Sequence, residues 1–123
     1  MISPTDARRR VQENLTGFPQ SVVEAYLGFA DTADVARLDQ VVLGVLQFYL
    51  AKPPPAPLPS MPGGTRLVAD LGCDSLTMID VMFLAENLLE IKLADDELAK
   101  IETLDELRAH FRRRMSAENA SAA

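Results

Sequence analysis

Residues 69–83 read ADLGCDSLTMIDVMF, with one serine, Ser75, at the point where a run of apolar residues begins. A glycine and an aspartate precede a run dominated by apolar side chains, which is typical of a loop that turns into a helix. We expect this helix to begin near Asp74 and Ser75 and to end near Leu89. At the helix start, the hydroxyl group of Ser75 has two alternative roles. It either caps the helix, or it carries a covalently attached group whose phosphate is stabilised by the helix N-terminus.

Three helices are predicted upstream of this stretch. The first starts at Ser3, with Pro4 at the first helical position, and ends near Thr16 and Gly17. The second starts around Pro19 and ends at residues 31–32, where a new helix cap is available. The third carries one apolar stripe at helical spacing, formed by Val35, Leu38, Val42, Val45, Leu46 and Tyr49.

A proline-rich segment, KPPPAPLPSMPGG, occupies residues 52–64. Its six prolines and two glycines exclude a helix or a central strand. We interpret it as an extended, fairly stiff connector between two helices. A ligand segment for an SH3-type domain is the alternative interpretation.

Downstream of the first stretch, a short helix is predicted at residues 95–100 and a last helix from Thr103. Thr103 and Glu106 have the spacing of a capping box. Residues 112–114 are three arginines, which we expect near the helix end, where cations complement the helix dipole. Leu104, Leu107 and Phe111 mark the face of this helix that we expect to be buried.

The charge distribution is uneven. The formal net charge is −6, but residues 70–106 contain 11 acids and 2 bases, whereas residues 1–69 are neutral and residues 107–123 carry +3. An acidic surface disfavours binding to nucleic acid, because phosphates are repelled. The central segment is therefore expected to meet partners whose surfaces are rich in lysine and arginine.

Single copies of cysteine and histidine limit the possible chemistry. Cys73 cannot form an intramolecular disulfide, and with His110 it cannot build a usual His/Cys metal site, so no bound metal is expected. We interpret Cys73 as a half-buried filler of the core. A small hydrolase using Ser75 and His110 is an alternative, although the sequence around Ser75 does not resemble a nucleophile elbow.

Without a secretory signal or a membrane span, we expect a soluble, cytoplasmic monomer.

Residues 67–81, together with LLEIKLADDELAKIETLDEL at residues 88–107, resemble acyl carrier proteins. The shared pattern is Asp-Ser-Leu preceded by Leu-Gly and a small residue, then an acidic link, a short helix and Ile-x-Thr before the final helix. The resemblance covers about residues 34–111. It implies an all-α fold, an antiparallel four-helix carrier bundle of three longer helices and a short one, with additional N-terminal helices. The corresponding domains are an N-terminal extension at 1–31, the bundle at 32–115 and a flexible tail at 116–123.

The resemblance further implies that Ser75 is the attachment site of 4′-phosphopantetheine, with Asp74 and Leu76 beside it. A magnesium-dependent phosphopantetheinyl transferase would donate this arm from coenzyme A. Its thiol would carry acyl groups as thioesters for fatty-acid, polyketide or related biosynthesis, so the chain would be a substrate of other enzymes rather than an enzyme. In the family, the helix after the serine is recognised by basic-surfaced acyl-transfer, ketosynthase or ligase enzymes. Here this surface would comprise Thr77, Ile79, Asp80, Phe83, Glu86 and Glu90.

Three residues depart from the pattern of fatty-acid carriers. Cys73 replaces the usual alanine, and Thr77 and Asn87 stand where acids are common, so the partners are expected to differ. A peptidyl or aminoacyl carrier, and an unmodified helical interaction module with Ser75 as a cap, are the alternatives. The role of the N-terminal helices is open, and we expect a chain without residues 1–30 to keep a folded bundle. Two interpretations remain open for a set of apolar residues: they line a space for the cargo, or they are ordinary core residues. These residues are Val42, Leu46, Met82, Leu89 and Ile101.

Overall fold

The computed structural model describes residues 3–92 and 100–122, with side chains for residues 3–92 and 100–115. This part of the chain is all-α, which confirms the predicted fold class. Its only extended pairing is an isolated antiparallel bridge between Arg66 and Thr103. The predicted short helix at 95–100 lies, except for Lys100, outside the described residues. The helices are α1 (Pro4–Asn14), α2 (Gln20–Thr32), α3 (Val35–Tyr49), η1 (Leu58–Ser60), α4 (Ser75–Leu89) and α6 (Leu104–Ala122).

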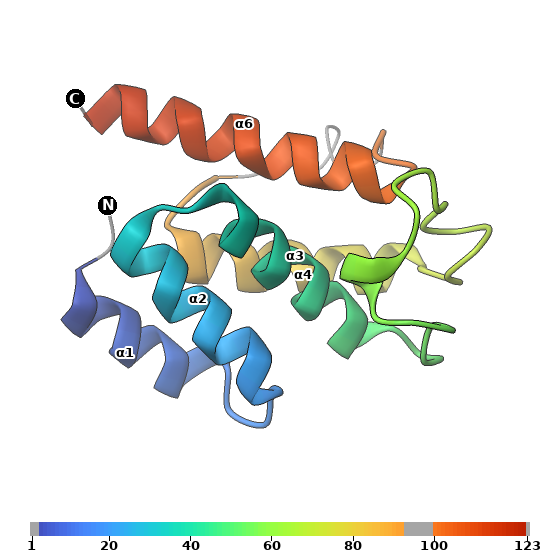
Figure 1. Ribbon diagram of the computed structural model, residues 1–123, viewed down its shortest axis with the longest axis horizontal. Helices are drawn as coiled ribbons and strands as arrows, with labels where there is room; N and C mark the ends of the chain where they lie inside the picture. The colour runs from blue at the N-terminus through green and yellow to red at the C-terminus, as the bar shows by residue number, and fades with distance from the viewer. Residues whose placement is uncertain (1–2, 93–99, 123) are drawn as a thin grey trace.

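Helix α3 lies at the centre of the fold and contacts α2, α4, α6 and η1. In Figure 1, α6 runs along one side of the molecule, while α1 and α2 lie on the opposite side. α3 runs in the opposite direction to α2, α4 and α6, so α4 and α6 are parallel to each other. The described helices therefore form a mixed bundle and not a strictly antiparallel one.

The helix boundaries follow local capping chemistry. Ser3 caps α1 as predicted, because its side chain accepts a hydrogen bond from the backbone N–H of Asp6 at 3.1 Å. The predicted end of the second helix at residues 31–32 is confirmed, but the cap of the next helix lies two residues further on, at Asp34. Thr32 stays helical and donates its hydroxyl hydrogen to the carbonyl of Gly28, and Ala33 then ends α2 in the left-handed conformation. Asp34 caps α3 through the backbone N–H of Ala36.

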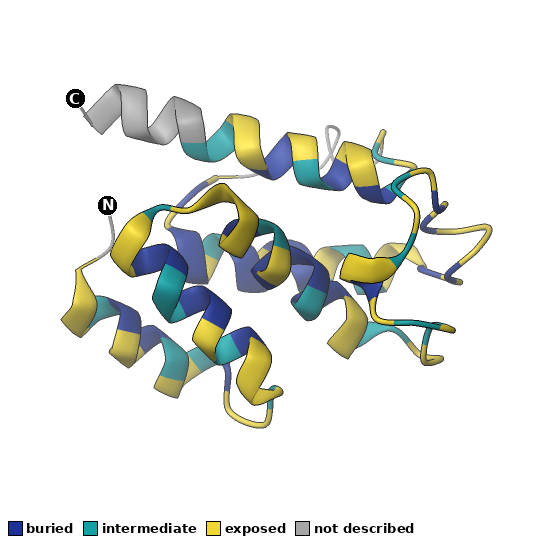
Figure 2. Cartoon of the chain, in the orientation of Figure 1, coloured by how far each residue is buried: buried dark blue, intermediate teal, exposed yellow. Residues whose placement is uncertain are grey.

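One apolar core includes residues from all of the longer helices. Figure 2 shows the buried positions turned toward the interior of the bundle. The N-terminal helices take part fully, since Leu15, Val22, Tyr26 and Phe29 are buried in the same cluster as the centre of α3. Gly44 permits this close approach, because a Cβ atom there would lie 2.6 Å from Val22 Cγ2. This arrangement argues against the expectation that residues 1–30 are dispensable for folding.

The proline-rich segment is a connector attached to α3. It contains one short 3₁₀ helix, η1, so the expectation that it excludes every helix is wrong. Leu58 causes this turn: its side chain is fully buried, and its backbone N–H donates to Gln47 Oε1 at 2.9 Å. Proline at the start of a helical turn loses no hydrogen bond, and this explains why Pro59 is tolerated there.

Helix α6 begins as predicted and ends later than predicted. Thr103 Oγ1 accepts a hydrogen bond from the backbone N–H of Glu106, and the Glu106 carboxylate contacts the same hydroxyl group. The helix continues to Ala122, through most of the segment predicted as a flexible tail. Residues 112–114 therefore lie within the helix and not at its C-terminal end. The proposed dipole role for these arginines is wrong, and Arg112 instead forms an ion pair with Asp39 of α3.

Candidate functional site

The N-terminus of α4 presents Ser75 to solvent. Asp74 is the N-cap residue, and its Oδ1 accepts a hydrogen bond from the backbone N–H of Thr77 at 2.8 Å. This hydrogen bond lowers the pKa of the Asp74 carboxyl group. Ser75 occupies the first helical position and is exposed. The capping role considered above for Ser75 therefore belongs to Asp74.

The loop before Ser75 is held against the start of α6. The backbone N–H of Leu67 donates to the carbonyl of Glu102 at 2.9 Å, and the N–H of Leu104 donates to Thr65 at 3.1 Å. The loop closes on itself through a bond from Cys73 N–H to the carbonyl of Leu67 at 2.8 Å. Gly72 makes this closure possible, because its φ of +68° is unfavourable for residues with a side chain. These bonds fix the position from which α4 begins.

Cys73 is buried next to the candidate attachment residue. Burial, with a smaller contribution from the negative charge of Asp74, raises the pKa of its thiol to about 11. Its Sγ atom lies 3.8 Å from the carbonyl oxygen of Asp74. A thiol in this state is a poor nucleophile, since the thiolate is the reactive form. The described geometry therefore agrees with a packing role.

Three large apolar side chains of α4 point into solvent. Leu76 is 65% exposed, Ile79 is 43% exposed and Phe83 is 57% exposed. Their spacing of three and four residues places them on one side of the helix, beginning next to Ser75. We call these three residues the α4 apolar stripe. Buried side chains, including Val81, Leu84, Ala85 and Leu88, cover the opposite side of α4, so the stripe is additional to the core.

The polar residues predicted for partner binding have different surroundings. Thr77 and Asp80 are half-buried, and the charge of Asp80 adds to burial in raising the pKa of Tyr49 on α3. Glu86 is half-buried as well. Glu90 is exposed at the C-cap of α4, with a left-handed φ of 54°.

The C-terminal end of α4 is held by both N-terminal helices. Arg10 of α1 is 7% exposed, donates through Nη1 to the carbonyl of Leu88 at 3.2 Å, and forms an ion pair with Glu90. Tyr26 of α2, also buried, donates its hydroxyl hydrogen to the same carbonyl at 2.6 Å. Sequence analysis missed this cluster, because Arg10 stands in a run of three arginines that gives no signal of burial.

A small apolar cavity lies between α3, α4 and α6. Its volume is about 10 Å³, and Val45, Ala85, Leu88 and Phe111 are among its lining residues. Of the residues predicted for a cargo space, Val42 and Leu89 line this cavity. A space of this size holds one water molecule at most. An acyl chain would enter only if the three helices moved apart.

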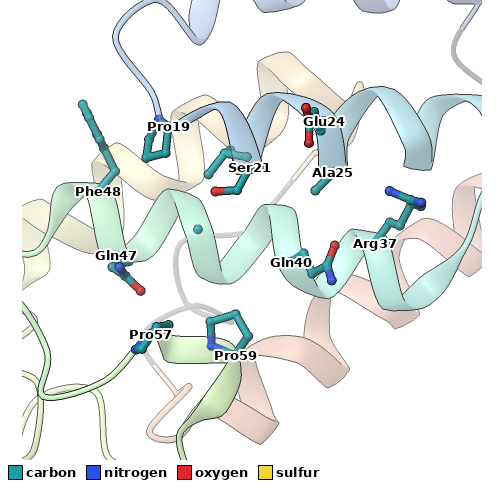
Figure 3. Close-up of a pocket in the computed structure, with 12 residues that line it drawn as sticks. Pro19, Ser21, Glu24, Ala25, Arg37, Gln40, Gln47, Phe48, Pro57 and Pro59 are labelled. Carbon is teal, nitrogen blue, oxygen red and sulfur yellow. The ribbon is translucent and has the colours of Figure 1, made fainter.

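A larger open pocket of about 580 Å³ lies between α2, α3 and the proline-rich connector. Figure 3 shows Ser21 and Glu24 of α2 on one side of α3, and Pro57 and Pro59 of the connector on the other. None of the site residues predicted from the sequence lines this pocket. We assign it no function.

His110 and Ser75 lie on different helices, α6 and α4. His110 is buried on α6, its ring lies edge-on to Phe111, and it lines a pocket of about 590 Å³ with Lys100, Glu106 and Arg113. Ser75 is exposed at the start of another helix and does not line this pocket. This arrangement gives no support to a serine–histidine hydrolytic site.

The described residues contain neither a metal-binding cluster nor a membrane-spanning helix. In residues 3–92 and 100–115, no three histidine, cysteine, aspartate or glutamate side chains gather in a way that would hold a metal ion. None of the helices in the described part of the chain combines the length and apolar character that crossing a bilayer requires. Comparisons with protein-family models, curated proteins and solved structures found no match for the chain.

Proposed function

We propose that this chain is an acyl carrier protein that bears 4′-phosphopantetheine on Ser75. One observation carries the proposal: Asp74 caps α4, while Ser75 stands exposed at the first helical position with its hydroxyl group not used as the cap. The simplest structural explanation for the serine is thereby removed. The arm would carry acyl intermediates of fatty-acid, polyketide or related biosynthesis as thioesters.

The local electrostatics support a phosphodiester at this position. The backbone N–H groups at the start of a helix and the positive end of its dipole stabilise negative charge. The carboxylate of Asp74 opposes this effect, but both groups are exposed, and solvent and salt screen their repulsion. Cys73 does not compete as an acceptor of the arm, because its thiol is buried and protonated at neutral pH.

The surface beside Ser75 supports docking by enzymes. The α4 apolar stripe offers area that can be buried on binding, and Asp74 and Asp80 give its surroundings a negative charge. A transferase or an acyl-processing enzyme with lysine and arginine around an apolar patch would complement it. Such charges act mainly on the rate of encounter, so association should slow as salt is added. We place this activity in the cytoplasm, with the carrier acting as a monomer.

Intact-mass measurement tests the proposal directly. The full chain is incubated with coenzyme A, magnesium and a phosphopantetheinyl transferase of broad specificity. We expect a gain of one phosphopantetheine group in the native chain and in Ser60→Ala, which alters an exposed serine of the connector. Ser75→Ala should show no gain. A folded native chain that stays unmodified with several transferases, or a Ser75→Ala variant that is still modified, would contradict the proposal.

A further inference from the structure

Two helices outside the carrier-like region converge on a single backbone group of α4. The carbonyl of Leu88 accepts hydrogen bonds from Arg10 Nη1 at 3.2 Å and from Tyr26 Oη at 2.6 Å. The same guanidinium group forms an ion pair with Glu90. A positive charge at a helix C-terminus is favourable, because it complements the helix dipole and satisfies a carbonyl that lacks a helical partner.

The two hydrogen bonds to the Leu88 carbonyl are buried and selective, whereas the Glu90 side chain of the ion pair is exposed. Arg10 and Tyr26 are both almost inaccessible to solvent, whereas Arg9 in the same helix is exposed and, among the described residues, pairs with Asp6 and Glu13 of α1. Hydrogen bonds that involve a charged, desolvated group are stronger than neutral ones. Glu90, the ion-pair partner of Arg10, is the C-cap of α4 and has a φ of 54°, a backbone conformation that residues with side chains seldom adopt.

The residues at this end of α4 also form a wall of the apolar cavity. Leu88 and Leu89 line the cavity from α4, opposite Val42 and Val45 of α3 and Phe111 of α6. Any enlargement of the cavity that moves the last turn of α4 outward must break the bonds from Arg10 and Tyr26. The N-terminal helices therefore add to the free energy needed to open the bundle.

We propose that α1 and α2 act as a clamp on the C-terminal end of α4, which keeps the cavity closed and keeps cargo outside the bundle. The part concerning cargo rests on the function proposed above. The clamp itself is a property of the unmodified chain. It gives the N-terminal helices a role that the carrier-like region alone does not explain.

Hydrogen exchange in the unmodified chain tests the clamp without reference to Ser75. The variant Arg10→Met/Tyr26→Phe removes the donors and preserves much of the buried volume, and Arg9→Met is the matched control. We expect amides of residues 84–91 to exchange about tenfold faster or more in the double variant, and at native rates in the control. Tyr26→Phe alone should give a smaller increase at the same residues, and it remains informative if the double variant does not fold.

A second measurement follows the cavity. Xenon is the probe, since it is apolar and enters cavities that exclude water. We expect tighter xenon binding in the variants that lack the clamp, with shifts in the NMR signals of Val45, Ala85 and Leu88. Faster exchange spread evenly over all helices, or unchanged exchange and xenon binding, would show that these bonds only stabilise the fold and would overturn the clamp.

A third measurement separates the clamp from the carrier function. If Ser75 accepts an octanoyl-phosphopantetheine arm, the double variant should shift the same core NMR signals on loading, and the native chain should not. Shifts of equal size in the native chain would overturn the exclusion of cargo. If Ser75 accepts no arm, the carrier proposal fails, and the exchange and xenon results still decide the clamp.

Discussion

Asp74 accepts a hydrogen bond from the backbone N–H of Thr77 at 2.8 Å, so the N-cap of α4 is the aspartate that precedes the candidate attachment serine. We therefore predict that Ser75→Ala leaves the melting temperature nearly unchanged, while Asp74→Ala lowers it. Alanine is a good helix former at the first helical position, but it cannot replace a capping side chain. Thermal unfolding followed by circular dichroism measures both effects. An equal loss of stability in the two variants would assign part of the cap to the serine hydroxyl.

The hydrogen bond between Asp74 and Thr77 also predicts that the stability of the fold depends on pH. The hydrogen bond from Thr77 lowers the pKa of Asp74 in the folded state below its ordinary value of 3.8. Its contribution to stability is therefore complete above the unfolded pKa and is lost as the pH falls through the folded pKa. Asp74→Asn keeps a capping oxygen that does not titrate. We expect the difference in melting temperature between the native chain and this variant to shrink as the pH falls from neutral to values below 3.8. A difference in melting temperature that does not change with pH would contradict the assignment.

Cys73 should resist alkylation in the native chain. Burial and the neighbouring Asp74 raise the pKa of its thiol to about 11, so the thiolate is scarce at neutral pH, and the sulfur is also inaccessible. We predict slow labelling by iodoacetamide without denaturant and rapid labelling in urea. Ser60→Cys in a Cys73→Ala background provides an exposed thiol for comparison. Labelling of native Cys73 at the rate of this exposed thiol would show that the loop opens readily.

Features with local causes were predictable from the sequence. The limits of α4 follow from Asp74 and the apolar run after it, and the starts of α1 and α6 follow from Ser3 and Thr103. The resemblance to acyl carrier proteins also implied that Ile79 and Phe83 belong to a contact surface and that Leu76 lies beside the attachment site, and all three side chains are exposed.

Features that depend on distant contacts were not predictable. The turn at Leu58 requires Gln47 on another helix, and the burial of Arg10 requires the end of α4, more than seventy residues away in the chain. Residues 112–114 were misplaced for a different reason. Nothing in the sequence beyond them stops a helix, and the apparent end was inferred only from the polar composition of the tail.

The N-terminal helices should be required for folding. Leu15, Val22, Tyr26 and Phe29 are buried in the common core, and burying each large apolar side chain is worth about 1.5–3 kcal/mol. Removing residues 1–33 would also expose the face of α3 that α2 covers. We predict that this truncated chain lacks cooperative thermal unfolding, whereas a chain beginning at Ser3 melts normally. A sharp transition in the chain without residues 1–33 would restore the view that they are a separable extension.

Gly44 on α3 should be coupled energetically to Val22 on α2. A Cβ atom at Gly44 would lie 2.6 Å from Val22 Cγ2, and a valine side chain has little freedom to move away. Gly44→Ala alone should lower the free energy of unfolding by about 1–2 kcal/mol, because overpacking outweighs the gain in helix propensity.

In a Val22→Ala background the clash is absent, so the same substitution should be neutral or stabilising by up to about 1 kcal/mol. Urea unfolding of the native chain, both single variants and the double variant gives the coupling energy directly. Additivity within about 0.5 kcal/mol would show that α2 and α3 can separate without cost at this point. That result would also weaken the case that the N-terminal helices belong to one core with the rest of the chain.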